Sequence, residues 1–276
     1  MIDEEITKFY NLIKADQWPT IKNYVDFINL PSHIKQECYA DYNLTQRKKD
    51  ICDRNYWVNL NTTVYVYKNL AFVPVPKCAS THYITIFQNL GWKKTKLVDI
   101  DRKTYNFFGV ILHPMQRHAK GITELIINSY RPATTAEYDF TTADYQKLEE
   151  DLRIASFRYL ISNIYVGDDH SMPYYSMFGD FLHEVNWIPL ELLSIDEQAC
   201  TIKHFCRLHG HDIDIPVQPI MHKSSQCQLR VYNQINDIFL ENKTRNYRLY
   251  HLFDYDLKFF YNLLDIFSKE WKHITQ

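Results

Sequence analysis

Residues 70–81 read Leu70-Ala-Phe-Val-Pro-Val-Pro-Lys-Cys-Ala-Ser-Thr81, and the fold follows from them. The run Leu70–Val75 is apolar and predicts a strand, in which Pro74 argues against a central place unless it lies at the strand's end. Small residues then make a tight turn. An apolar stripe at helical spacing follows the turn: Tyr83, Ile84, Phe87 and Leu90. The stretch therefore predicts a strand, a turn and a helix in direct succession, with Gly91 just past the helix end.

The neighbouring segments extend this pattern into an α/β core. Thr63–Tyr67 alternates and predicts a hairpin strand before residue 70. Asn106–Leu112 is an apolar run typical of a strand buried on both faces, and Pro114 suits the first position of a following helix. Strand, helix, strand, helix indicates a parallel sheet, whose ligands bind beyond the carboxyl ends of the strands. We therefore expect the two junctions, Pro76–Thr81 and Leu112–Arg117, at one edge of the sheet.

The remaining segments are mostly helical. We expect helices over the first 55 residues, a strand region at 181–193, and a helix at 195–208 that ends at Gly210. Three further helices are expected over 142–164, over 228–240 and from 244 to the end. The predicted division is a helical segment at 1–58 and an α/β domain at 59–276.

Composition narrows the classes of function. Lys plus Arg is 31 and Asp plus Glu is 33, so the net charge is −2, which disfavours a nucleic-acid binder. Six glycines in 276 residues leave little for a glycine-rich phosphate loop. The acidic start resembles no signal peptide and no apolar run is long enough to span a bilayer, so we expect a cytoplasmic protein without a membrane partner. The six cysteines form no C-x-x-C pair and are expected to be free thiols.

The first junction has the chemistry of an anion site. Backbone N–H groups at the start of a helix attract anions, Ser80 and Thr81 add hydroxyl donors, and Lys77 adds a charge. A Walker A loop requires G-x-x-x-x-G-K-S/T, which is absent, so ATPase, GTPase and small-molecule kinase functions are disfavoured. From these residues alone, an anion site and a plain helix cap with a surface lysine remain equally open.

Phe72–Thr81, with the hairpin before it, resembles the 5′-phosphosulfate loop of carbohydrate sulfotransferases, which show a strand, P-K-x-G/A-S/T-T and a helix. The resemblance implies a P-loop-like parallel sheet flanked by helices. It implies PAPS, 3′-phosphoadenosine 5′-phosphosulfate, as donor, with PAP as product and no metal. The donor site that it implies at this junction comprises Lys77, Cys78, Ala79, Ser80 and Thr81.

The second junction matches that family in part. The family places R-D-P-x-x-R-x-x-S after the next buried strand to bind the donor's 3′-phosphate. Here Pro114 and Arg117 match, Leu112 stands in place of the first Arg, and Lys120 in place of the Ser. The resemblance implies that Arg117 and Lys120 bind PAPS. Lys120 would replace the positive charge of the missing Arg, and His113 would add a hydrogen-bond donor. Weak 3′-phosphate recognition is the alternative.

Three later stretches follow in the family's order, so that the resemblance covers about residues 62–262. Asp168–Pro173 resembles D-x-H-x-x-P-Q, with Tyr174 replacing the Gln. Pro219–Gln226 resembles the loop that closes over the nucleotide, which adds Lys223 and Ser224 to the implied donor site. Tyr250–Phe260 resembles the terminal Y-x-x-D-Y/F helix, with one extra residue before Asp254.

Sulfuryl transfer also needs a base for the acceptor hydroxyl, and His is the usual choice near neutrality. His170 is the first candidate and His113 the second, ahead of His82 and of Glu124, which is expected to be a solvated helix residue. Lys77 is the expected catalytic cation. Cys78 is expected to be a packing residue, and a metal at Asp168, Asp169 and His170 is disfavoured because the remaining ligands are missing.

The sequence therefore predicts sulfuryl transfer from PAPS to a hydroxyl, with a carbohydrate as the expected acceptor. A non-catalytic nucleotide- or glycan-binding protein that kept this fold is the alternative, which Leu112 favours. The Arg131–Phe140 loop and the aromatic run Tyr174–Phe178 are candidates for the acceptor surface. Ordinary core and rim aromatics are the other explanation for the run.

Overall fold

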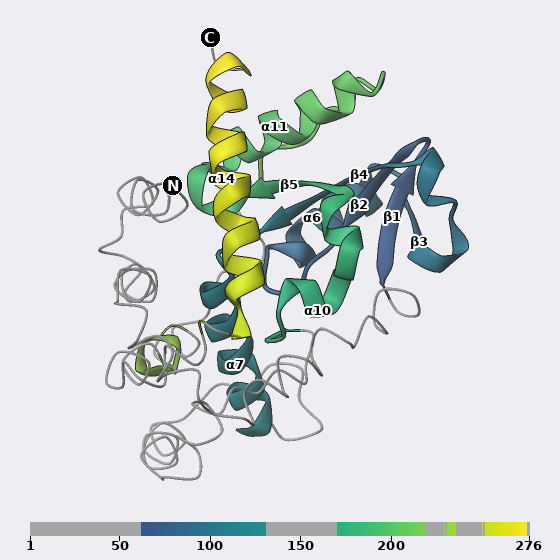
Figure 1. The fold of residues 1–276 in the computed structure, drawn as a ribbon. Helices are drawn as coiled ribbons and strands as arrows, with labels where there is room; N and C mark the ends of the chain where they lie inside the picture. Colours follow the sequence, from purple (N-terminus) through teal and green to yellow (C-terminus); the bar gives the residue numbers. More distant parts are fainter. Residues whose placement is uncertain are drawn as a thin grey trace.

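The computed structural model describes residues 62–130, 170–218, 229, 231–235, 250 and 252–274. These residues form an α/β unit, a five-stranded mixed sheet with flanking helices (Figure 1). The helices predicted over the first 55 residues and over 142–164 lie outside the described residues. So does most of the helix predicted over 228–240.

The strands lie in the order β3-β1-β2-β4-β5. The hairpin β1 (Thr63–Tyr67) and β2 (Leu70–Val73) is antiparallel, and β3 (Lys93–Lys96) pairs antiparallel with β1 at the edge. β4 (Asn106–Ile111) runs parallel to β2, and β5 (Val185–Pro189) runs parallel to β4. The parallel half of the sheet is therefore β2-β4-β5, as the strand–helix succession predicted.

Two of the predicted strands are shorter in the structure. β2 ends at Val73 rather than residue 75, because Pro74 and Pro76 have no N–H to donate to a ladder. Pro74 thus lies just past the end of a central strand. The region 181–193 contains only the five residues of β5, between the 3₁₀ turns η4 (Gly179–His183) and η5 (Leu190–Leu192).

Sequence analysis missed β3, whose residues are Lys93-Lys-Thr-Lys96. Its lysines are exposed, so it has no apolar alternation to reveal a strand. Charged residues of this kind are common on edge strands, where they oppose pairing with another chain. The turns η2 (Leu97–Asp99) and η3 (Arg102–Thr104) then lead to β4.

The parallel strands are followed by helices. α6 (Ser80–Asn89) follows β2, α7 (Pro114–Tyr130) follows β4, and α11 (Ile195–Leu208) follows β5. The predictions that α7 starts at Pro114 and that α11 spans 195–208 are confirmed. Gly91 and Gly210, with φ of 82° and 84°, come just after α6 and α11, as expected for residues that end helices. Ser194 and Glu197 form a capping box at the start of α11.

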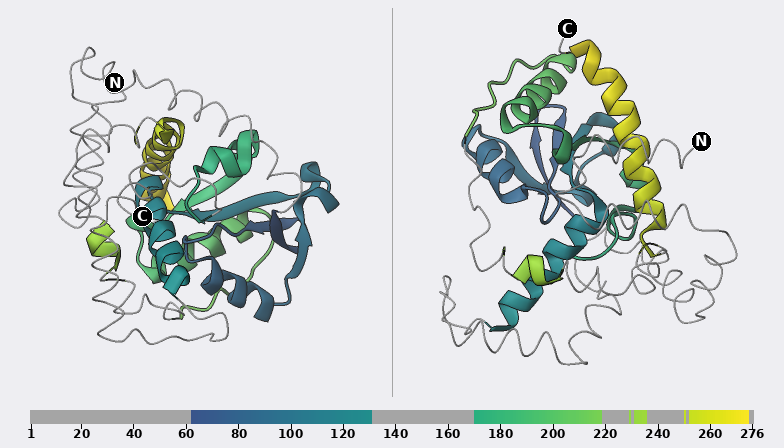
Figure 2. Two further views of the ribbon diagram at one scale, coloured as in Figure 1. Left: turned by 90° about the horizontal axis from the view of Figure 1, so that it is seen from below. Right: turned by 90° about the vertical axis from the view of Figure 1, so that its left-hand side faces the viewer.

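Two further helices complete the unit. α10 (Tyr174–Phe178) is a single short element before η4, and α14 (Asp254–Ile274) is the long C-terminal helix. α14 packs against β5, α7 and α10, and lies on the opposite side of the sheet from α6 (Figure 2). No helix in the described ranges is both long and apolar enough to cross a bilayer.

The core is aromatic on both faces of the sheet. Phe72 and Phe108 lie on one face, where their rings contact Phe87 of α6 and Phe205 of α11. Phe107 lies on the other face and contacts Phe181 of η4 with ring centroids 4.9 Å apart. Adjacent residues of β4 thus enter opposite layers, as side-chain alternation in a strand requires.

Candidate functional site

The two predicted junctions lie at the same edge of the sheet. β2 and β4 are adjacent and parallel, with Val73 paired to Gly109, so the turns that follow them are neighbours. The expected common edge is confirmed. β5 ends at the same edge and is followed at once by η5, which contains Glu191. The candidate site therefore lies beyond the carboxyl ends of all three parallel strands.

The first junction is a left-handed turn made without glycine. Lys77 has φ 66° and Ala79 has φ 55°, and the Cys78 N–H donates to the Val75 carbonyl oxygen over 3.1 Å. Each left-handed residue with a Cβ costs about 1–2 kcal/mol, so the surrounding contacts impose this shape. Strain of this kind clusters at binding sites.

The helix α6 starts without a side-chain cap. Ala79 is its N-cap residue, and its methyl side chain caps no N–H of the first turn. The choice between an anion site and a plain helix start with a nearby lysine stays open. Thr81 is exposed, and Ser80 is half-buried. The first turn of α6 keeps the orphan N–H groups that favour an anion.

Lys77 is held beside α7 by an ion pair. Its Nζ lies 2.8 Å from Glu124 Oε2, and the two side chains are 22% and 23% exposed. Glu124, expected to be a solvated helix residue, is partly exposed on α7 and pairs with the lysine of the first junction. An anion that binds Lys77 competes with this carboxylate.

Arg117 joins three of the stretches that sequence analysis selected. It is 1% exposed, its Nε donates to the Pro76 carbonyl over 3.1 Å, and its Nη1 donates to the Met172 carbonyl over 2.5 Å. Its guanidinium lies 4.8 Å from the ring centre of Tyr174. Arg117, which the resemblance implies as a PAPS-binding residue, thus donates these hydrogen bonds to backbone carbonyls of the protein itself.

The stretch around His170 lies along α7. The ring Nδ1 of His118 is 2.7 Å from the Ser171 carbonyl oxygen. A Cβ at Gly121 would lie only 2.1 Å from the His170 carbonyl oxygen, so glycine is required for this backbone approach. The first candidate base, half-buried His170, is therefore anchored next to the second junction through its backbone.

Tyr174 ties the two junctions together. Its hydroxyl donates to the Leu112 carbonyl over 2.8 Å, accepts from the Leu112 N–H over 3.3 Å, and lies 3.4 Å from Cys78 Sγ. Burial raises the pKa of the Cys78 thiol, so the thiol stays protonated. The expectation of a packing role for Cys78 agrees with this environment.

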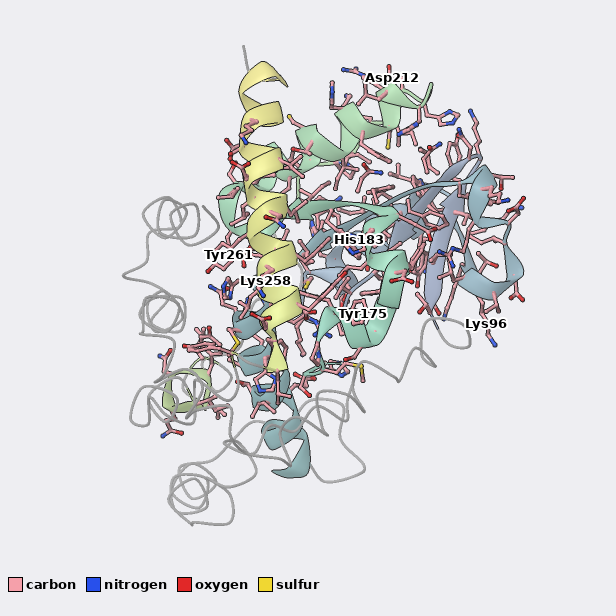
Figure 3. All side chains as sticks on the ribbon, viewed as in Figure 1. Lys96, Tyr175, His183, Asp212, Lys258 and Tyr261 are labelled. Carbon is pink, nitrogen blue, oxygen red and sulfur yellow. The ribbon has the colours of Figure 1, made fainter. Side chains whose placement is uncertain are left out.

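The C-terminal stretch reaches the same region through Asp256. This residue is 1% exposed, and its carboxylate accepts the N–H of Tyr174 and, over 2.9 Å, the N–H of Tyr175. Burial raises the pKa of Asp256 to about 7, against the lowering effect of these hydrogen bonds. The aspartate that matched the family segment, Asp254, pairs instead with Lys258, which lies on α14 (Figure 3).

His113, the second candidate base, is part of the core. It has no exposed surface, its Nε2 lies 3.0 Å from the Tyr261 hydroxyl of α14, and its Nδ1 accepts from the Met115 N–H over 3.3 Å. Burial lowers the pKa of His113 to about 3, so the ring is neutral at pH 7. His113 is therefore a buried structural histidine, which was the alternative to its role as a base. His82 is also buried, and burial lowers its pKa.

Sequence analysis missed Glu191. One of its carboxylate oxygens accepts the His113 N–H, and the other is buried without a hydrogen-bond partner among the described residues. Burial raises the pKa of Glu191 to about 7, and the charge of Lys120 opposes that rise. Its place just after a third parallel strand could have revealed it. The predicted strand region over 181–193 was too broad to show where that strand ends.

Lys120 lies between the two junctions. Burial lowers the pKa of Lys120; the nearby charge of Glu191 raises it, and that of Lys77 lowers it further. Lys77, Lys120 and Glu191 are therefore close enough to affect one another's charge. Gln116, one turn earlier on α7, has no exposed surface, and neither amide atom has a hydrogen-bond partner within the described ranges. The site thus contains polar groups that no described residue satisfies.

Several predicted residues lie outside the described residues: Lys223 and Ser224, Asp168 and Asp169, and the Arg131–Phe140 loop. Within the part of the chain that the structure describes, no three His, Cys, Asp or Glu side chains are grouped to hold a metal ion. Cys78, Cys200 and Cys206 are free, as expected.

The aromatic run over 174–178 is mostly interior. Tyr174, Met177 and Phe178 are buried, so ordinary core packing explains them. Tyr175, labelled in Figure 3, is half-buried. Its ring packs against that of Tyr255 on α14, with centroids 4.2 Å apart and the planes tilted by 46°. Only Tyr175 and its partner remain as aromatic candidates for an acceptor surface in this run.

Comparison of the chain with protein-family models, with curated proteins and with solved structures finds no match to any of them.

Proposed function

We propose that this protein is a sulfotransferase that moves a sulfuryl group from PAPS to a hydroxyl, with a carbohydrate as acceptor. One observation carries the proposal: Lys77 lies in a strained turn before the uncapped first turn of α6, beyond the ends of three parallel strands. Lys120 adds a second positive charge nearby. This arrangement suits the phosphosulfate end of PAPS, which needs backbone N–H groups and cations rather than a metal.

The proposed chemistry is in-line displacement at sulfur. The acceptor oxygen forms a bond to sulfur, and the bond from sulfur to the bridging phosphate oxygen breaks, so PAP leaves with the electron pair. Lys77 and the N–H groups of residues 78–81 stabilise the charge that develops on the leaving phosphate oxygen. His170 takes the proton of the hydroxyl. Binding must first exchange the Lys77–Glu124 pair for the donor's anionic oxygens.

A non-catalytic nucleotide- or glycan-binding protein is the second candidate. Arg117 and His113 favour it, because both direct their polar atoms into the protein. Such a protein shows no turnover with any acceptor; in its nucleotide-binding form it binds PAP, and in its glycan-binding form it does not.

The first test is calorimetric titration with PAP, with ATP as control. Selective micromolar binding of PAP that is lost in Lys120→Ala supports the donor site. Lys93→Ala, on the exposed edge strand β3, is the matched control and should leave binding unchanged. No binding at millimolar PAP would overturn both candidates that use this nucleotide.

Turnover separates catalysis from binding. Lys77→Ala should lower the transfer rate at least about 10²-fold, since it removes charge stabilisation at the leaving group. Its free energy of unfolding should fall by less than about 1 kcal/mol, because the Lys77–Glu124 pair is partly exposed. The measurement is PAP release from PAPS over a panel of oligosaccharide acceptors, and normal turnover would remove Lys77 from the mechanism.

His170→Ala tests the base. We expect the rate to fall by about 10²–10⁴ with little change in PAP affinity, because the residue acts on the acceptor side. An unchanged rate would assign the proton to another group.

A further inference from the structure

Glu191 occupies an unusual position in the candidate site. It is the second residue after β5. One carboxylate oxygen accepts the His113 N–H, and the other is buried with no hydrogen-bond partner among the described residues. A buried carboxylate oxygen without a donor is costly when charged. Its charge therefore depends on the cations that lie near it.

The groups around Glu191 come from four elements. Lys120 of α7 supplies positive charge, and the junction after β4 supplies the His113 N–H, beside a ring that stays neutral. The turn before α6 supplies Cys78, and α10 supplies Tyr174; both groups stay protonated, because burial raises their pKa values. Lys120 is thus the cation that stabilises the Glu191 carboxylate.

Lys120 also belongs to the first junction, where it lies close enough to Lys77 and Cys78 for their charges to affect its pKa. An anionic group that binds at the first turn of α6 attracts the same ammonium group. It also places negative charge near a buried carboxylate. Both effects favour the neutral form of Glu191.

We propose that Glu191 couples anion binding to proton uptake: when the donor's dianionic group occupies the first turn of α6, Glu191 takes one proton. This inference rests on the proposed function and adds a pH-dependent control to the same site. Protonation removes the repulsion between the Glu191 carboxylate and the bound anion and frees Lys120 to pair with the ligand. It also gives the unpartnered oxygen of Glu191 a proton to donate.

Glu124 differs from Glu191 and serves as the comparison. Its side chain is 23% exposed and its ion pair with Lys77 is open to water. Solvent stabilises its carboxylate once the lysine turns to a ligand, so no proton is required. The linkage is therefore specific to the buried carboxylate.

The test is calorimetric titration of PAP between pH 6 and 8.5, in pairs of buffers with different ionisation enthalpies. The three proteins are the wild type, Glu191→Gln and Glu124→Gln. The phosphates of PAP titrate near pH 6 in all three, so differences between the proteins isolate the protein's contribution. Glutamine keeps the shape of Glu191 and an oxygen for the His113 N–H, while it mimics the protonated acid.

The free carboxyl titrates near pH 7, and bound anion raises that midpoint, so the wild type takes up a proton above pH 7. Its affinity should fall about tenfold more than that of Glu191→Gln between pH 6.5 and 8.5. At pH 8.5 Glu191→Gln should bind PAP about tenfold more tightly than the wild type, and at pH 6 equally. Glu124→Gln should bind more tightly at every pH and keep the wild-type slope.

The outcomes separate this inference from the proposed function. PAP binding with equal pH slopes and no proton uptake in the wild type overturns the role of Glu191 and leaves the donor site standing. A slope that Glu124→Gln abolishes also overturns it, because the proton then belongs to the exposed pair. Absence of PAP binding overturns the proposed function and this inference together.

Discussion

The two strand–helix junctions occupy equivalent places in the sheet and use their polar residues differently. In the first, Lys77 and Ala79 hold left-handed conformations, and α6 begins without a side-chain cap. In the second, α7 begins at Pro114 with ordinary geometry, and Arg117 and His113 are buried and bonded to other parts of the protein. The first junction retains a helix start without a side-chain cap near its surface. The second connects strands, α10 and α14, although the Gln116 amide within it has no partner among the described residues.

This difference assigns binding and support to separate segments. A ligand site needs groups that are held in place but not satisfied internally. The first junction has such groups because the second holds it through the Arg117–Pro76 hydrogen bond. The family resemblance implies that Arg117 binds PAPS. In the structure it donates to the backbone of the first junction and stabilises the shape of that turn.

The largest expected effect is at Gly121, which supports the second junction. Gly121→Ala places a Cβ 2.1 Å from the His170 carbonyl oxygen, a backbone atom that cannot move aside alone. We expect the free energy of unfolding to fall by more than about 4 kcal/mol. Urea unfolding measures it.

The control is Gly91→Ala, where φ is 82° and no atom lies within 4 Å of the added Cβ. It should cost only about 1 kcal/mol, from the left-handed backbone alone. Equal losses in the two variants would show that the contact between α7 and residues 170–171 is unimportant.

Arg117→Met comes next and tests whether this residue supports the fold. The change leaves the carbonyls of Pro76 and Met172 without their donor and removes the cation near Asp256. We expect a loss of about 3 kcal/mol in the free energy of unfolding. Arg207→Met, which breaks an exposed pair with Asp212, should cost less than about 1 kcal/mol.

A contrary result for Arg117 would change the comparison. If Arg117→Met unfolds at the wild-type urea concentration and loses PAP binding, the arginine belongs to the ligand site, and the second junction binds rather than supports.

The smallest effect is expected at the first junction. Ala79→Gly relieves a left-handed alanine and should raise the free energy of unfolding by about 1 kcal/mol. Ala199→Gly, inside α11, should lower it by about the same amount, since glycine weakens a helix interior. Thermal unfolding of both variants checks the signs. A loss of stability in Ala79→Gly would show that the turn stores no strain.

Local patterns predicted β1, β4, the start of α7 and all of α11, because each has a periodic apolar pattern or a clear terminal residue. They missed β3, since four polar edge residues form a strand only through pairing with β1. The common edge of the two junctions was also predictable, because parallel neighbouring strands have only one way to place their carboxyl ends.

The candidate site was predictable only as a set of segments. The first junction, Arg117, the stretch that begins at His170 and the C-terminal stretch meet at one edge of the sheet. Glu191 was missed because its burial and its place beside Lys120 depend on where β5 ends. His113 was selected as a base because it follows a strand, but α14 covers it. Its partner Tyr261 lies 148 positions later in the chain, too far for any local pattern to reveal the contact.

The order of residues alone therefore set the α/β class, the parallel half of the sheet, and the edge at which the candidate site lies. These features depend on strand and helix periodicity and on chain connectivity, which are local. Tertiary packing decided which polar groups at that edge are satisfied: α14 and α10 cover His113 and Arg117, while Lys77 stays partly exposed and Glu191 Oε2 is buried without a hydrogen-bond partner among the described residues. Burial and hydrogen bonding are properties of the assembled layers, and they determine whether a side chain supports the fold or is available to a ligand.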